Sequence, residues 1–239
     1  MGNNALVLKP EHASVAMSVI AGWAATEVHL GRVFATLIGA KHPVAMSMYV
    51  AARSYEVQRD LLLAAAREVL AKRYATRIED ALVVMGRSAS IRHRFAHWIW
   101  GASADPDLNA LLLVEPKHFW SLAVDQIRVM RGKRPKTPDE YNQMMPHLKR
   151  DQMLVYTLKD LKDARDEIET AFTIADHLRA LVQAPAALRP TLYRRLGSMP
   201  PIQTALADKK RKAHMQKAQG LRSPSGESRR RSHRPPSVS

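Results

Sequence analysis

The chain has 239 residues, a length that suits one domain with appendages or at most two small domains. Aromatic residues make up only 6% and glycines number only 10, while Ala, Leu, Val and Met are abundant, so composition favours helices over strands. Because the chain has no cysteine, disulfides, thiolate metal sites and cysteine nucleophiles are excluded. The same absence agrees with a reducing compartment, and we expect a cytoplasmic protein.

The most apolar segment near the N-terminus is ASVAMSVIAGWAA, which is shorter than the ~18 residues that a membrane-spanning helix needs. It also lacks the basic leader and the cleavage pattern of a signal peptide. We therefore predict a buried helix here and no association with a membrane.

Net charge is +15, and it is spread unevenly along the chain. The segment 208–239 holds ten Lys or Arg and two acids, which gives it +8 of that total. Such a field favours polyanions, and nucleic acid is the obvious candidate. The alternative is that the basic segment only aids solubility.

Hydrophobic periodicity predicts three long helices before residue 100. The first covers about 12–39, and its expected buried side is Val19, Trp23, Val28, Leu30, Phe34, Leu37 and Ile38. The second runs from about Val44 to Arg73. The third begins near Tyr74 and leads into IRHRFAHWIWG, with Ser88 or Ser90 expected to cap a fresh helical start.

After Gly101 the pattern changes. GASADPDLN predicts a turn-rich loop, ALLLVEP a short strand, and 131–146 a surface loop. A helix then starts at the N-cap Thr157, with Asp160 at its third position. Its expected apolar stripe is Leu161, Ala164, Ile168, Ala171, Phe172, Ala175 and Leu178.

One or two short helices are predicted within 190–207, with Pro201 at a helix start. From Asp208 onward apolar residues nearly vanish, so burial cannot offset the entropy of ordering. The sequence thus predicts an all-α fold: a helical domain over 1–207, with a short loop and strand insertion after the third helix, and a disordered basic tail over 208–239.

The third helix carries one arginine where an apolar residue is expected. Its stripe, in steps of three and four, is Ile78, Leu82, Met85, Ala89, Arg92, Ala96 and Ile99. An unpaired guanidinium on such a stripe costs roughly several kcal/mol in lost hydration, so Arg92 must meet an acid, line a cleft or face another chain. The acid that the sequence offers is Glu27, in the apolar part of the first helix.

His97 lies five residues after Arg92, which is about 140° around an ideal helix. One helix alone would therefore not direct both side chains to the same point. This geometry favours a site that is completed by a second copy of the chain across a two-fold axis.

Arg92 and His97, within RHRFAH, resemble the Arg-x4-6-His signature of HEPN domains, which often reads Arg-Asn-x-x-Ala-His. The order of predicted helices is also similar, and the resemblance covers about 10–184. It implies an antiparallel helical bundle and metal-independent RNA cleavage at a homodimer interface, in which the 2′-hydroxyl attacks the adjacent phosphate. It also implies a toxin or defence factor, whose antitoxin would resemble a nucleotidyltransferase.

Carried over from the resemblance, His97 would be the general acid or base and Arg92 would bind the scissile phosphate. His93 stands where Asn is common and would supply a hydrogen bond or a second proton-transfer group. Trp98 stands where Gly is common and would narrow the cleft or stack a base. No metal and no cofactor is implied. We predict RNA contacts from Arg94, Trp98, Lys209, Lys210, Arg211, Lys212, Arg229, Arg230 and Arg231.

Other interpretations stay open at this point. His93 and His97 share a helix face, as zinc-binding pairs do, although no third ligand is evident. Arg92 could instead pair with Glu27 while His97 packs. A catalytically inactive HEPN-like domain that binds RNA or a partner is the main alternative function. A DNA-binding regulator is the third, although the sequence lacks a helix-turn-helix signature.

Overall fold

The computed structural model describes residues 4–102, 109–132 and 137–220. Over these residues the protein is mostly helical with one small antiparallel sheet, in agreement with the expected fold class. The elements before the sheet are α1 (Asn4–Leu8), α2 (Pro10–Ile38), α3 (His42–Ala51), α4 (Tyr55–Val69) and α5 (Lys72–His97). The sheet contains β1 (Ile99–Ala102), β2 (Ala110–Val114) and β3 (Met153–Thr157).

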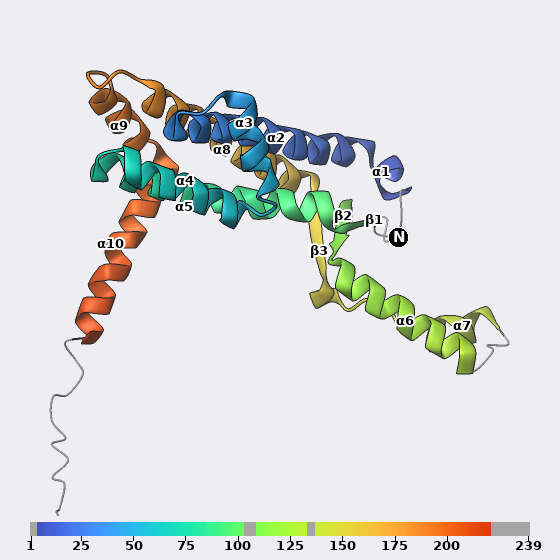
Figure 1. The fold of residues 1–239 in the computed structure, drawn as a ribbon. Coiled ribbons are helices and arrows are strands. Elements are labelled where there is room, and N and C mark those ends of the chain that lie inside the picture. The colour runs from blue at the N-terminus through green and yellow to red at the C-terminus, as the bar shows by residue number, and fades with distance from the viewer. Residues whose placement is uncertain (1–3, 103–108, 133–136, 221–239) are drawn as a thin grey trace, which may run out of the picture.

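Between β2 and β3 lie α6 (Pro116–Gly132), α7 (Pro138–Met144) and the short 3₁₀ turn η1 (Arg150–Gln152). The chain then continues through α8 (Leu158–Gln183), α9 (Arg189–Gly197) and α10 (Pro200–Gly220). Helices α2, α3, α4, α5 and α8 form an elongated body (Figure 1). The sheet lies at one end of this body with α6 and α7 beyond it, and α9 and α10 lie at the other end.

The core is centred on α2 and α8, which lie side by side along the body (Figure 1). Leu161, Ile168 and Leu178 of α8 are buried as predicted, but Phe172 is 36% exposed and Ile174 is buried in its place. On α2 the buried side likewise includes Val33 rather than Val28 or Ile38. Both errors arise because 3.6-residue periodicity fixes a broad apolar side but not its edges.

Helix α8 starts where the sequence predicts. The Thr157 hydroxyl accepts a hydrogen bond from the Asp160 backbone N–H at 3.2 Å, and the Asp160 carboxylate accepts one from the Thr157 backbone N–H at 2.9 Å. This capping box satisfies two backbone donors that the helix cannot satisfy itself. It also fixes the point at which the chain leaves β3 for the core.

The strand predicted from ALLLVEP is β2, the central strand of the sheet. It pairs antiparallel with β1, with Ile99 opposite Val114, and with β3, with Ala110 opposite Thr157. Sequence reasoning missed the two edge strands, because IWGA and MLVYT are too short to show a period on their own.

Two boundaries of the predicted helices were wrong. The single helix expected from Val44 to Arg73 is divided into α3 and α4, because the Ser54 side chain caps α4 by accepting from the Val57 backbone N–H at 3.3 Å. Conversely, α5 runs without a new start at Ser88 or Ser90. Their hydroxyls donate to the carbonyls of Glu167 and Gly86, so neither serves as a cap.

The expectation of a surface loop over 131–146 was wrong in part, since α7 occupies Pro138–Met144 behind the N-cap Thr137. The predicted disorder of 208–239 was also wrong for its first part. Helix α10 continues to Gly220, and the Lys209 Nζ lies 3.0 Å from the carboxylate of Asp80 on α5. Residues 221–239, with Arg229, Arg230 and Arg231, lie outside the described residues.

Side chains of other helices approach the α2 backbone closely at two glycines, Gly22 and Gly31. A Cβ at Gly22 would lie 2.8 Å from Cγ2 of Ile168, a stiff branched side chain in the core. A Cβ at Gly31 would meet the flexible end of Met46. The Ile168 side chain cannot move away without a large cost in free energy, whereas the Met46 side chain can adopt another rotamer.

We therefore expect Gly22→Ala to lower the free energy of unfolding by about 1–3 kcal/mol, because it overpacks the α2–α8 contact. Gly31→Ala is the matched control and should change stability by less than about 1 kcal/mol, since its gain in helix propensity offsets the displacement of Met46. Urea unfolding of both variants measures this difference. Equal effects would contradict the distinction between the two sites.

The ion pair between Lys209 and Asp80 predicts that the start of the basic segment contributes to stability. Asp80 is buried, so Lys209→Met leaves its carboxylate without a partner. Because Lys209 itself is 61% exposed, we expect a loss of only about 1 kcal/mol, or ~2–4 °C in Tm. Lys210→Met removes the same charge one residue later and should leave the melting temperature unchanged in a calorimetric scan.

Candidate functional site

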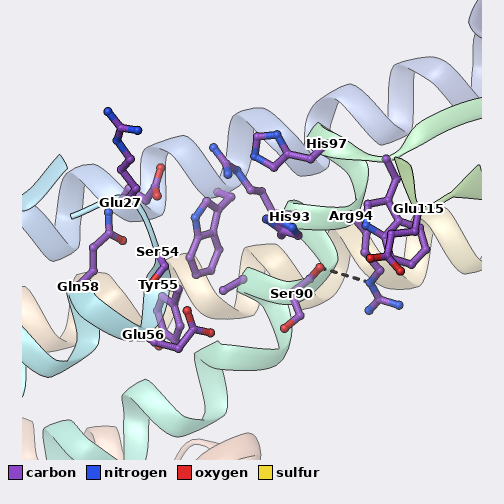
Figure 2. Close-up of a pocket in the computed structure, with 15 residues that line it drawn as sticks. Glu27, Ser54, Tyr55, Glu56, Gln58, Ser90, His93, Arg94, His97 and Glu115 are labelled. Atoms are coloured by element: carbon purple, nitrogen blue, oxygen red, sulfur yellow. Dashed lines mark hydrogen bonds between the residues drawn. The ribbon is translucent and has the colours of Figure 1, made fainter. Parts of the chain in front are cut away.

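A cleft of about 520 Å³ lies where the last turns of α5 meet α2 and the start of α4 (Figure 2). Helix α5 contributes five polar side chains, α2 contributes Trp23 and Glu27, the start of α4 and the turn before it contribute further polar side chains, and Glu115 directly follows β2. The lining residues that can bind or transfer protons are Glu27, Arg53, Glu56, Arg92, His93, Arg94, His97 and Glu115.

The wall formed by α4 is held in place by three contacts of Tyr55 and Gln58. The Tyr55 hydroxyl donates to the Leu82 carbonyl, which ties the start of α4 to α5, and the Tyr55 ring packs edge-on against Trp23 at 5.7 Å. The buried Gln58 side chain donates to the Ala52 carbonyl at 3.0 Å. These contacts hold Arg53, in the turn between α3 and α4, at the edge of the cleft.

Arg92 lines this cleft without an ion-pair partner. Its Nε is buried and has no hydrogen-bond partner among the residues that the structure describes. Glu27 lines the same cleft, but no ion pair joins it to Arg92, so the pairing suggested by the sequence is absent. A guanidinium in this state retains its hydrogen-bonding capacity for an anion that enters the cleft.

His93 and His97 lie one helical turn apart, with ring centroids 4.8 Å from each other (Figure 2). The pKa of His97 is lowered from its usual value by partial burial first, and then by the positive fields of His93 and Arg92. At neutral pH its imidazole is therefore mostly uncharged, with a nitrogen free to accept a proton.

The expected composite site assumed that one helix cannot bring Arg92 and His97 to the same place. Both side chains of one chain line the same cleft, although an ideal helix separates them by about 140°. One chain therefore brings both side chains to the same cleft, and completion of the site by a second copy stays a prediction.

Arg94 and Trp98 also line the cleft, as the prediction of nucleic-acid contacts requires. Arg94 Nε donates to the Ser90 carbonyl at 3.3 Å, which holds its stem along α5 (Figure 2). Trp98 is the C-cap residue of α5 and is half-buried, and Trp100 is fixed by a hydrogen bond from its Nε1 to the Phe95 carbonyl at 3.1 Å. Trp98 thus keeps part of its ring surface open to a ligand.

The predicted basic residues Lys209, Lys210, Arg211 and Lys212 lie on α10 and not in this cleft. Lys209 meets α5 at Asp80, and Arg92 lies twelve residues further along that helix, or about 18 Å. The structure thus separates the predicted nucleic-acid contacts into two groups, one at the end of α5 and one on α10, which contacts α5 through Lys209.

Sequence reasoning missed Arg53, Glu56 and Glu115 as cleft residues. Arg53 and Glu56 flank the Ser54 cap, and Glu115 precedes Pro116 at the end of β2. Arg53 was missed because the break between α3 and α4 was not predicted, so this residue was expected inside one continuous helix. Glu115 forms an ion pair with Lys117 at 2.7 Å.

Metal binding at His93 and His97 would need further ligands. Among the described residues, no group of three or more His, Asp or Glu side chains is arranged to hold a metal ion. In the same part of the chain, no helix is both long enough and apolar enough to cross a membrane.

Comparison with family models, with curated proteins and with solved structures finds no match for this chain. The chemistry of the cleft must therefore carry the functional conclusion. That chemistry consists of a half-buried arginine, whose buried Nε has no hydrogen-bond partner among the described residues, beside two histidines, one of which has a lowered pKa.

We expect His93→Ala to raise the pKa of His97 toward 6.5, because it removes one of the positive fields that disfavour the imidazolium ion. The change in pKa is upward, because the charged form of His97 gains stability when a neighbouring positive charge is removed. His12→Ala is the control, since that residue contacts Asn109 outside the cleft. An NMR titration of the imidazole carbons would show this change, and a His97 that titrates identically in both variants would contradict the electrostatic coupling.

Proposed function

We propose that this protein is a metal-independent endoribonuclease that resembles HEPN proteins and acts as a homodimer. The observation that supports it most directly is that Arg92, whose buried Nε has no partner in the described part of the chain, shares one cleft with His97. A phosphodiester supplies the anion that Arg92 lacks, and His97 accepts a proton near neutral pH.

In the proposed reaction, His97 takes the proton of a ribose 2′-hydroxyl, whose oxygen attacks the adjacent phosphorus. The bond from phosphorus to the 5′-oxygen breaks, and His93, when protonated, gives that oxygen a proton as it leaves. The products are a 2′,3′-cyclic phosphate and a 5′-hydroxyl end. Arg92 stabilises the charge that develops on the nonbridging oxygens.

Charge supports RNA as the substrate class. Arg53, Arg92 and Arg94 line the cleft, and α10 presents further Lys and Arg side chains at the other end of the body. Trp98 offers a ring surface for a base. The resemblance adds the proposal of a toxin or defence factor, neutralised by a nucleotidyltransferase-like antitoxin.

The test is cleavage of a mixed single-stranded RNA by purified protein in excess EDTA. We expect His97→Ala and Arg92→Ala to reduce the rate by at least about 10²-fold, because each removes a group that acts on the transition state. His177→Ala, on α8 and outside the cleft, should cleave as the wild type does. The end groups of the products identify the cyclic phosphate.

Folding and assembly of each variant are checked by circular dichroism and sedimentation. RNA binding without any cleavage would favour the catalytically inactive binding module instead. Strict dependence on an added divalent ion would contradict the proposed mechanism. Growth arrest on expression, relieved by His97→Ala, would support the proposed role as a toxin.

A further inference from the structure

One end of the cleft holds a carboxylate that the proposed reaction does not use. Glu27, on α2, is half-buried, and its side chain forms no hydrogen bond or ion pair with another described residue. Glu27 contributes to the raised pKa of Tyr49, after burial and the field of Tyr55, yet the Tyr49 hydroxyl has no hydrogen-bond partner in the same part of the chain. Both oxygens of Glu27 are therefore open to donors that enter the cleft.

Arg53 lies at the same end of the cleft. It directly precedes Ser54, and Figure 2 shows Ser54 and Glu27 together beside the start of α4. His93 and His97 lie further along the cleft (Figure 2). The Arg53 side chain is exposed and forms no ion pair or hydrogen bond within the described ranges. This end thus presents an acceptor and a donor that are not paired with each other.

The direction of the helices determines which histidine is nearer to this end. Helix α1, just before α2, contacts β1, just after α5, so α2 and α5 run antiparallel. Trp23 of α2 packs against Tyr55, whose hydroxyl is bonded to the middle of α5. Glu27 lies about one turn beyond Trp23, further from the end of α5. It therefore lies on the side of His93 that faces away from His97.

Guanine is the base that fits an open carboxylate near an arginine. Bases of single-stranded RNA are recognised on their Watson–Crick and Hoogsteen edges. Guanine has two adjacent donors, N1–H and the N2 amino group, whereas adenine, cytosine and uracil each present one donor beside acceptors. A carboxylate only accepts, so guanine alone can use both of its oxygens. The O6 and N7 atoms of guanine accept two hydrogen bonds from a guanidinium.

We propose that Glu27 and Arg53 bind a guanine base, so that RNA is cut directly before guanosine. Glu27 accepts from N1–H and the N2 amino group, and Arg53 donates to O6 and N7. The place of the cut rests on the proposed function, in which His93 gives a proton to the leaving 5′-oxygen of the nucleotide on its own side. The cleft, at about 520 Å³, lies in the range of pockets that hold small ligands.

Separation of Glu27 from Arg92 keeps both groups available. No ion pair joins the two, although they line one cleft. The guanidinium of Arg92 is thus free to bind a phosphate while the carboxylate of Glu27 binds a base, and one nucleotide carries both chemical groups. Because a duplex already uses the Watson–Crick edge, these contacts require single-stranded RNA.

The first test measures binding, so its outcome does not depend on cleavage. The probes are short labelled polyadenosine strands whose central base is G, A, U or C, with 2′-O-methyl riboses that cannot supply the attacking hydroxyl. By fluorescence anisotropy, we expect the G probe to bind the full chain at least about tenfold more tightly than the others. Glu27→Gln should reduce this ratio to about twofold, because an amide has only one acceptor oxygen. Glu68→Gln, on α4 outside the cleft, should keep the ratio.

Base analogues test each contact by itself. Inosine lacks the N2 amino group, and 7-deazaguanine lacks the N7 acceptor. The wild type should bind each analogue roughly fivefold to tenfold more weakly than guanine. Glu27→Gln should lose the difference between guanine and inosine, and Arg53→Met the difference between guanine and 7-deazaguanine. Arg150→Met, an exposed site on η1 outside the cleft, should discriminate as the wild type does.

Cleavage of a mixed single-stranded RNA tests the position of the cut. Wild-type products should begin with guanosine, and Glu27→Gln should cut before all four bases. Guanine-selective binding without cleavage would support the base site and contradict the nuclease alone. Equal affinity for the four probes, preference for another base, or a guanine preference that persists in Glu27→Gln would overturn the base site, whether or not the chain cleaves RNA.

Discussion

Contact between α2 and α8 is the constraint on which the rest of the structure depends. The two helices lie side by side over most of their length, and Gly22 lets the Ile168 side chain approach the α2 backbone. The capping box at Thr157 determines where α8 begins, and the αL residue Gly39 ends α2. Since α8 starts directly from β3, this pair also fixes the sheet relative to the bundle.

The cleft is a consequence of this arrangement. Helix α5 is tied to α8 by the hydrogen bond from Ser88 to the Glu167 carbonyl, and α2 supplies the floor through Trp23. Arg92 is thereby held at a partly buried place where its Nε has no hydrogen-bond partner among the residues that the structure describes. Keeping such a group costs free energy that the packed core must offset, which is common where a site is prepared for a ligand.

Local signals in the sequence predicted the parts of the fold that depend on nearby residues. The Thr157 cap, the strand at Ala110–Val114 and the exceptional position of Arg92 are all present in the structure. The predictions that were wrong concern parts of the fold that depend on tertiary contacts. Helix α10, for example, is ordered partly by the hydrogen bond from Lys209 to Asp80, which lies 129 residues away in sequence. The cleft residues Arg53 and Glu115 could not be found either, because only the folded chain brings their segments to α5.

Helix α5 joins two features that the sequence presents as unrelated. Near its start, Asp80 holds Lys209 and with it the basic helix α10, while its last turns carry Arg92, His93 and His97. Because an α-helix is stiff and rises about 1.5 Å per residue, the separation along α5 is fixed at about 18 Å. A polyanion that contacts both groups must be at least that long. Under the proposed function, Lys210, Arg211 and Lys212 would attract long RNA to this chain more strongly than mononucleotides, whereas Arg92 would contact a single phosphate.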